Sequence, residues 1–113
     1  MQKPSGNKDT LAKVLPAFIE YTNELLYGEV WERSELSPRD RSLITIASLM
    51  AQNKMDQLPN HLKFGLKNGL TVEEISEAIT HLAFYASWPN AIQAGKRFLE
   101  VVEDQEKEAA ASE

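Results

Sequence analysis

Two histidines are the side chains in this sequence best suited to proton transfer near neutral pH, because the unperturbed pKa of imidazole is about 6.5. They are His61 and His81, and the chain contains no cysteine. Without a thiol there is no disulfide, no thiolate metal ligand and no sulfur nucleophile or redox couple. Any chemistry must therefore use oxygen or nitrogen groups, or a bound cofactor.

His61 falls on the apolar stripe of a helix predicted over residues 57–68. That stripe comprises Leu58, Leu62, Gly65 and Leu66. Burying an imidazole there without a partner costs about 1 to 3 kcal/mol. His61 therefore either makes a hydrogen bond in the core or faces a polar cavity. The pattern leaves both interpretations open, and His61 is the first candidate for a catalytic residue.

His81 lies on the polar side of a helix predicted over residues 71–87. Glu77 precedes it by one turn, and Tyr85 and Trp88 follow at spacings of four and three residues. Two interpretations fit this pattern. The side chains are either half-exposed helix residues or subunit contacts, or they form one wall of a substrate pocket in which Glu77 orients the imidazole.

Arg41 is the candidate for binding an anion. Before it come Ser37, Pro38 and Asp40, which form a helix start with serine as the N-cap, proline at the first helical position and an acid three residues after the cap. The first turn of a helix favours anions because its N–H groups lack partners within the helix. Arg39 fits an exposed ion pair better, whereas Arg41 directly precedes an apolar run.

Five helical segments are expected to position these residues, and no segment shows the alternation of a strand. They span residues 9–27 with a kink or break at Pro16, 38–52, 57–68, 71–87, and 90 into the tail. Gly69 should close the third segment, and a capping box of Thr71 and Glu74 should open the fourth. The second is apolar around most of its circumference and should be central. We therefore predict an all-α, compact multi-helix subunit, with residues 1–113 forming one domain.

The charge balance gives little support to nucleic-acid binding. The net charge is −5, but residues 103–113 hold five acids and one lysine, so the remaining body carries only −1. No apolar run approaches the roughly 18 residues of a spanning helix, and residues 1–10 lack a signal-peptide core. We expect a cytoplasmic protein with no membrane or nucleic-acid partner. Without a phosphate loop or a His-x-x-x-His pair, we expect neither a cofactor nor a metal.

Five fragments occur in an order and spacing similar to those of one protein family. They are GEVW at 28–31, LSPRDRSLIT at 36–45, QLPNH at 57–61, NGLTVEEI at 68–75 and HLAFYASWP at 81–89. Over about residues 26–102 the chain resembles the γ-carboxymuconolactone decarboxylase family. The resemblance implies an all-helical subunit in a homo-oligomer, commonly a hexamer or trimer, with sites near subunit contacts. Five short helices around an apolar centre also suggest more apolar surface than one small subunit covers.

The same resemblance brings in the alkylhydroperoxidase D branch, whose peroxidase site uses two cysteines, a glutamate and a histidine. Gln57 and Lys54 stand where that branch has its cysteines, and Ser42 lies close to the place of its glutamate. Of the four site residues only the histidine has a counterpart, His61. The dithiol mechanism is therefore excluded for this chain by itself.

The decarboxylase branch implies a small anionic substrate, a lactone dicarboxylate. Loss of CO₂ leaves electron density on the unsaturated lactone, so the reaction needs an anion clamp, stabilisation of the enolate and a proton donor. By this resemblance His61 donates the proton, and aromatic rings exclude water. The substrate-binding residues are then Arg41, His81, Tyr85, Trp88 and Trp31.

One departure from the family pattern is Ser87, which stands where many relatives have glycine. The lip of the pocket is expected to differ there. The alternative function is a non-catalytic or accessory oligomeric protein that keeps the fold, since one scaffold can host several activities.

Overall fold

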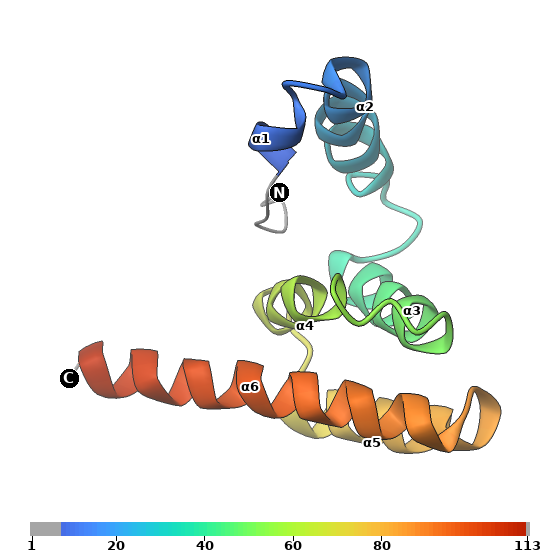
Figure 1. Cartoon of the computed structure of the whole chain (residues 1–113), viewed down its shortest axis with the longest axis vertical. Coiled ribbons are helices and arrows are strands. Elements are labelled where there is room, and N and C mark those ends of the chain that lie inside the picture. The colour runs from blue at the N-terminus through green and yellow to red at the C-terminus, as the bar shows by residue number, and fades with distance from the viewer. Residues whose placement is uncertain (1–7, 113) are drawn as a thin grey trace.

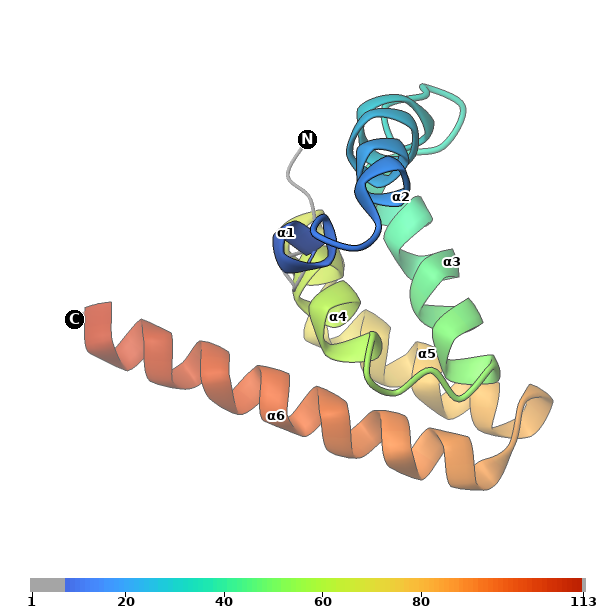
Figure 2. The same cartoon turned by 45° about the horizontal axis from the view of Figure 1, so that its top comes forward.

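The computed structural model describes residues 8–112, and these contain helices and no strand, which confirms the all-α prediction. The elements are α1 (Lys8–Leu11), α2 (Pro16–Tyr21), the π-helix η1 (Thr22–Val30), α3 (Pro38–Ala51), α4 (Leu58–Lys67), α5 (Val72–Tyr85) and α6 (Trp88–Ser112). Helices α1, α2 and η1 lie at one end of the molecule and α5 and α6 at the other, with α3 and α4 between them (Figures 1 and 2). We call α1, α2 and η1 together the arm.

Helix α3 contacts every other helix of the body, but it is fully buried on one face only, at Ser42, Ile46 and Met50, so the prediction of an all-round covered helix holds in part. It packs against α4, α5 and α6, and α6 packs in turn on α4 and α5. The core formed by these four helices and the loop before α5 consists of Ile46, Met50, Leu58, Leu62, Leu70, Ile75, Ile79, Ala94, Phe98 and Val101. Two apolar residues of α3, Ile44 and Ala51, are exposed.

The predicted caps at the starts of α3 and α5 and at the end of α4 are confirmed. The Ser37 hydroxyl accepts a hydrogen bond from the Asp40 amide, and Thr71 and Glu74 form the reciprocal capping box. Gly69 has a φ of +111°, a conformation that glycine adopts without steric cost. These local signals fix the starts of α3 and α5 and the end of α4.

Gly65 allows α4 to approach the rest of the core closely. A Cβ at this position would lie 2.9 Å from Leu70 Cδ1 and 3.1 Å from Ile46 Cδ1, so a side chain would push the helices apart. His61 is one turn earlier on the same helix, and its position relative to the core therefore depends on this close contact.

The arm follows the predicted break but not the predicted helix type. Helix α1 ends at Leu11 and α2 begins at Pro16, so proline takes the first helical position. The chain then continues as a nine-residue π-helix to Val30, three residues beyond the predicted end. The Trp31 amide donates to the Leu26 carbonyl at 3.0 Å, a bond of π-helical spacing.

Helix α6 begins at Trp88, two residues before the predicted start. The Ser87 hydroxyl accepts a hydrogen bond from the Asn90 amide at 3.1 Å, as an N-cap side chain does. Pro89 is compatible with this first turn because amides there need no partner within the helix. The serine that departs from the family pattern thus caps α6, which continues through the exposed acidic tail to Ser112.

Candidate active site

Three buried aromatic rings join the base of the arm to α4. The Trp31 ring centroid lies 5.2 Å from that of Phe64 and 5.8 Å from that of Tyr27, and Tyr27 meets Phe64 edge-on at 6.3 Å. Trp31 is only 6% exposed. We call Tyr27, Trp31 and Phe64 the aromatic cluster; it is separate from the main core and fixes the arm on the body.

His61 borders the aromatic cluster. Its ring stands edge-on to Phe64 with the centroids 6.5 Å apart, and the two residues are neighbours on α4 at a spacing of three. The side chain is half-buried, with its Nδ1 atom shielded from solvent. The position is the one predicted from the apolar stripe, at the edge of the interior rather than on an open surface.

Arg41 is held against the connector that follows Trp31. Its Nη2 atom donates a hydrogen bond to the carbonyl of Arg33 at 3.1 Å. Its Nε atom is buried, and no residue in 8–112 accepts a hydrogen bond from it. A buried guanidinium donor of this kind favours an acceptor, and carboxylates suit it best because arginine binds them in a forked geometry.

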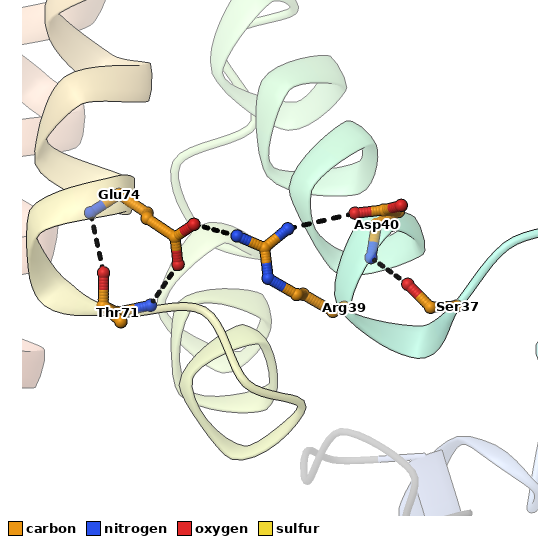
Figure 3. A network of polar contacts seen from close by, with 5 residues as sticks. All are labelled: Ser37, Arg39, Asp40, Thr71 and Glu74. Carbon is orange, nitrogen blue, oxygen red and sulfur yellow. Dashed lines mark hydrogen bonds and ion pairs between the residues drawn. The ribbon is translucent and has the colours of Figure 1, made fainter.

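Arg39, in the same helix turn, makes ion pairs instead. Its guanidinium pairs with Asp40 at 3.1 Å and with Glu74 of α5, and Glu74 also closes the capping box with Thr71 (Figure 3). This network ties the start of α3 to the start of α5. It confirms the expectation that Arg39 makes ion pairs, and it leaves Arg41 as the arginine of this turn that makes no ion pair within residues 8–112.

The other three predicted site residues take part in a second group of rings, at the junction of α5 and α6. His81 stacks on Tyr85 with centroids 4.9 Å apart, and Trp88 meets Phe84 edge-on at 5.7 Å. Tyr85 is 78% exposed and Trp88 60%. The described chain thus brings Trp31 and His61 around Phe64 and holds Arg41 on the adjoining connector, whereas His81, Tyr85 and Trp88 form an open surface.

Tyr27 and Phe64 belong to the candidate site but were not predicted to do so from the sequence. The available signal for Phe64 was its spacing of three residues from His61, and for Tyr27 its spacing of four from Trp31. Burial raises the pKa of the Tyr27 phenol above its ordinary value of 10.0, because the charged phenolate is disfavoured away from water.

Alkaline titration should detect this burial. We expect Tyr27→Phe to remove phenolate absorbance that appears above pH 10 in the wild-type protein. Because the folded chain holds the proton more tightly than the unfolded chain, this group contributes stability that falls as the pH rises above 10. The absorbance difference between the two proteins is the measurement. A difference whose midpoint lies at or below pH 10 would contradict the raised pKa.

No group of three or more His, Asp or Glu side chains within residues 8–112 is placed to hold a metal ion. Nor does any helix in this range combine the length and the apolar character needed to cross a membrane.

Comparison with known proteins identifies relatives of this chain by sequence similarity. A 4-carboxymuconolactone decarboxylase from Acinetobacter baylyi is 38% identical over 87 residues, covering 77% of this chain and 65% of that protein. The nitrosuccinic acid decarboxylase npaB of Metarhizium robertsii is 36% identical over 75 residues, covering 66% of this chain and 52% of that protein. The chain thus matches less than two thirds of the length of either relative.

A family-level match also covers most of the chain. Residues 16–100 match the carboxymuconolactone decarboxylase family, a range that includes α2 and η1 of the arm as well as the body. It starts before the first of the five sequence fragments, which begins at Gly28. The aromatic cluster, His61 and Arg41 all lie inside it. The chain therefore belongs to the carboxymuconolactone decarboxylase family.

Proposed function

We propose that the protein is a lyase that removes CO₂ from a small anionic carboxylate. The observation that carries the proposal is that Arg41 and His61 are each linked to the segment around Trp31, Arg41 through the connector that follows it and His61 through Phe64. Arg41 donates to the carbonyl of Arg33, which follows Trp31 by two residues, and Trp31 and His61 both contact Phe64. A proton-transfer group thus borders the aromatic cluster, and an anion-binding group is hydrogen-bonded to the connector that follows Trp31.

The names of the two relatives support a common type of reaction. A carboxymuconolactone has a lactone carbonyl, and a nitrosuccinic acid has a nitro group. Both groups can accept the electron pair that remains when the C–C bond to CO₂ breaks. For this chain we propose a carboxylate with such an electron-accepting group nearby, including the cyclic carbonyl or lactone type.

The proposed roles follow from charge and burial. Arg41 binds a carboxylate of the substrate through its guanidinium, and positive charge close to the reacting group stabilises the electron density that develops. As the C–C bond breaks, its electron pair moves into the carbonyl or nitro group. His61, as imidazolium, then donates a proton to a carbon of the resulting enolate or nitronate. The aromatic cluster limits the access of water on one side.

His81, Tyr85 and Trp88 remain proposed substrate-binding residues. Their open position at the α5–α6 junction fits that role only where another subunit covers them, since a substrate pocket normally encloses its ligand. We therefore propose that the protein works as a homo-oligomer, a hexamer or trimer.

Release of CO₂ tests the proposed function. The purified protein should release CO₂ from 4-carboxymuconolactone or from nitrosuccinic acid faster than the uncatalysed reaction. The heat-denatured protein at the same concentration is the control. Absence of release above that control from both compounds would contradict the proposal and would favour a non-catalytic oligomeric protein.

A peroxidase assay tests the exclusion made from the sequence. We expect no dithiol-dependent reduction of an alkyl hydroperoxide, because the chain has no thiolate to attack the peroxide. The measurement is hydroperoxide consumption by the metal-free protein with a dithiol as electron donor. Consumption above the rate without protein would show that the exclusion is wrong.

A further inference from the structure

The residue pair at the end of α4, Asn68 and Gly69, is the one in this chain with the greatest tendency to deamidate. Of the six asparagines in the sequence, only Asn68 is followed by glycine. The backbone nitrogen of the next residue can attack an asparagine side chain, and glycine has no Cβ to hinder the approach. Asparagine is one of the thermally labile residues of proteins for this reason. The proposed function uses neither residue.

Deamidation forms a cyclic imide and releases ammonia. The deprotonated Gly69 nitrogen forms a bond to the Cγ atom of Asn68, and the bond from Cγ to Nδ2 breaks. Water then opens the imide at either carbonyl, which gives aspartate or isoaspartate. In isoaspartate the main chain passes through Cγ. Water is consumed and ammonia is released, so the reaction needs no oxidant, reductant or cofactor, and Gly69 is exposed to water.

The folded chain holds Asn68 in an unreactive conformation. Its φ is −84° and its ψ is 3°. At this ψ the Gly69 nitrogen lies on the side of the Asn68 backbone nitrogen, whereas ring closure requires it on the side of Cβ. The leaving group is held as well, because Nδ2 of Asn68 donates a hydrogen bond to the hydroxyl of Ser42 at 3.0 Å. Ser42 is completely buried on α3.

The attacking nitrogen also takes part in the helix end. The Gly69 amide donates to the Leu66 carbonyl at 3.3 Å, and the Leu70 amide donates to the Gly65 carbonyl at 2.9 Å. Rotation about ψ of Asn68 breaks both bonds, since both donors follow it in the chain. Ring closure therefore requires the last turn of α4 to open. Helix ends open locally at a lower free energy than the whole fold does.

We propose that Asn68 is a site of spontaneous deamidation, and that its rate is controlled by local opening of the end of α4 against the hydrogen bond to Ser42. One opening event both frees the Gly69 nitrogen and releases the side-chain amide from α3. The inference concerns a covalent modification and stands independently of the proposed reaction.

The modification would act on the packing of α4. A carboxylate at position 68 cannot donate to Ser42, and it adds negative charge at the negative end of the helix dipole. Isoaspartate adds a backbone atom before Gly69, so the two hydrogen bonds that close the helix lose their spacing. Leu70, the next residue, is part of the main core. Deamidation therefore loosens the helix that carries His61.

Mass spectrometry of the aged protein is the first test. The full chain is incubated at weakly alkaline pH, folded or unfolded in denaturant, and is then digested at acid pH, where the imide forms slowly. We expect aspartate and isoaspartate at position 68 in both samples, formed about 10- to 1,000-fold more slowly in the folded chain because only the locally open fraction reacts. No conversion in the folded chain, or equal rates in both samples, would overturn the proposal.

Ser42→Ala tests the control by the hydrogen bond. We expect deamidation of the folded variant to be about 2- to 10-fold faster than in the wild type, the range for loss of one hydrogen bond. Ile79→Val is the matched control, because it removes a buried methyl group from α5 and lowers the stability of the whole fold. Its rate should equal that of the wild type. An unchanged rate in Ser42→Ala, or a rate that rises equally in both variants, would overturn the proposal.

Hydrogen exchange of the wild-type chain gives a second measurement that does not depend on the folding of a variant. The Leu70 amide should exchange through the same opening, because its bond to the Gly65 carbonyl breaks when Asn68 rotates. Its protection factor should match the ratio of the unfolded and folded deamidation rates within about tenfold. Protection of Leu70 far above this ratio would contradict the local opening.

Discussion

The His61→Gln protein is expected to lose about 10²-fold or more in turnover on any carboxylate that the wild type decarboxylates. Glutamine keeps a polar side chain at the edge of the aromatic cluster but cannot supply a proton near neutral pH. Because the imidazole is only half-buried, the fold and the assembly should be retained. Turnover and melting temperature measured on the same preparation give the result.

His81→Gln is the matched control, and its loss of turnover should be smaller, since His81 is exposed and stacks on Tyr85. A purely structural role of His61 predicts a different outcome. The melting temperature would then fall by several degrees for about 1 kcal/mol lost, and activity would fall only as far as folding does. Full activity of a folded His61→Gln protein would contradict the catalytic assignment.

Arg41→Gln is expected to lower kcat/KM by roughly 10- to 100-fold, because hydrogen bonds to charged groups contribute about 1.5 to 3 kcal/mol. The loss should appear largely in KM if the guanidinium binds substrate and transition state alike. Steady-state kinetics over a range of substrate concentration separates the two constants. The substitution removes a buried donor, so the melting temperature of the variant must be measured as well.

Arg39→Gln provides the control for this charge change, because Arg39 lies on the same helix turn and pairs with Asp40 and Glu74. Its ion pairs are partly exposed, and such pairs contribute about 0 to 1 kcal/mol to stability. We expect kcat/KM close to that of the wild type. Equal losses in the two variants would show that positive charge at the start of α3, rather than Arg41 itself, affects the reaction.

The helix boundaries of the body followed from the sequence because their signals are local. Ser37 and Thr71 begin helices through side chains that accept hydrogen bonds from amides three residues later. Gly69 ends one through a conformation that glycine adopts easily. Helix α6 starts two residues before the predicted position, because the Ser87 hydroxyl caps it and Pro89 is compatible with its first turn.

The π-helix in the arm could not be predicted in the same way. Its sequence has the apolar pattern of an ordinary α-helix. Whether its backbone hydrogen bonds span four or five residues depends on how the end of the helix packs. Here Tyr27 and Trp31 pack together on Phe64, which is distant in sequence. Such long-range contacts leave no periodic signal in the sequence.

The sequence predicted individual residues of the candidate site but not their arrangement. His61, Arg41 and Trp31 were singled out separately, from an apolar stripe, from the start of a helix and from the family resemblance. Their arrangement depends on how the arm packs against α4. This packing brings Trp31 and His61 to the same ring, Phe64, and Arg41 binds the connector after Trp31. The pairing of His81 with Tyr85 followed from helical spacing alone.

A crystal structure with a bound, unreactive dicarboxylate tests the central claim most directly. The proposed function predicts a carboxylate of the ligand within hydrogen-bond distance of the Arg41 guanidinium, with the His61 imidazole facing the carbon next to the reacting carboxylate. The aromatic cluster should border the same ligand. A dicarboxylate bound elsewhere, in contact with neither Arg41 nor His61, would contradict the assignment of this site.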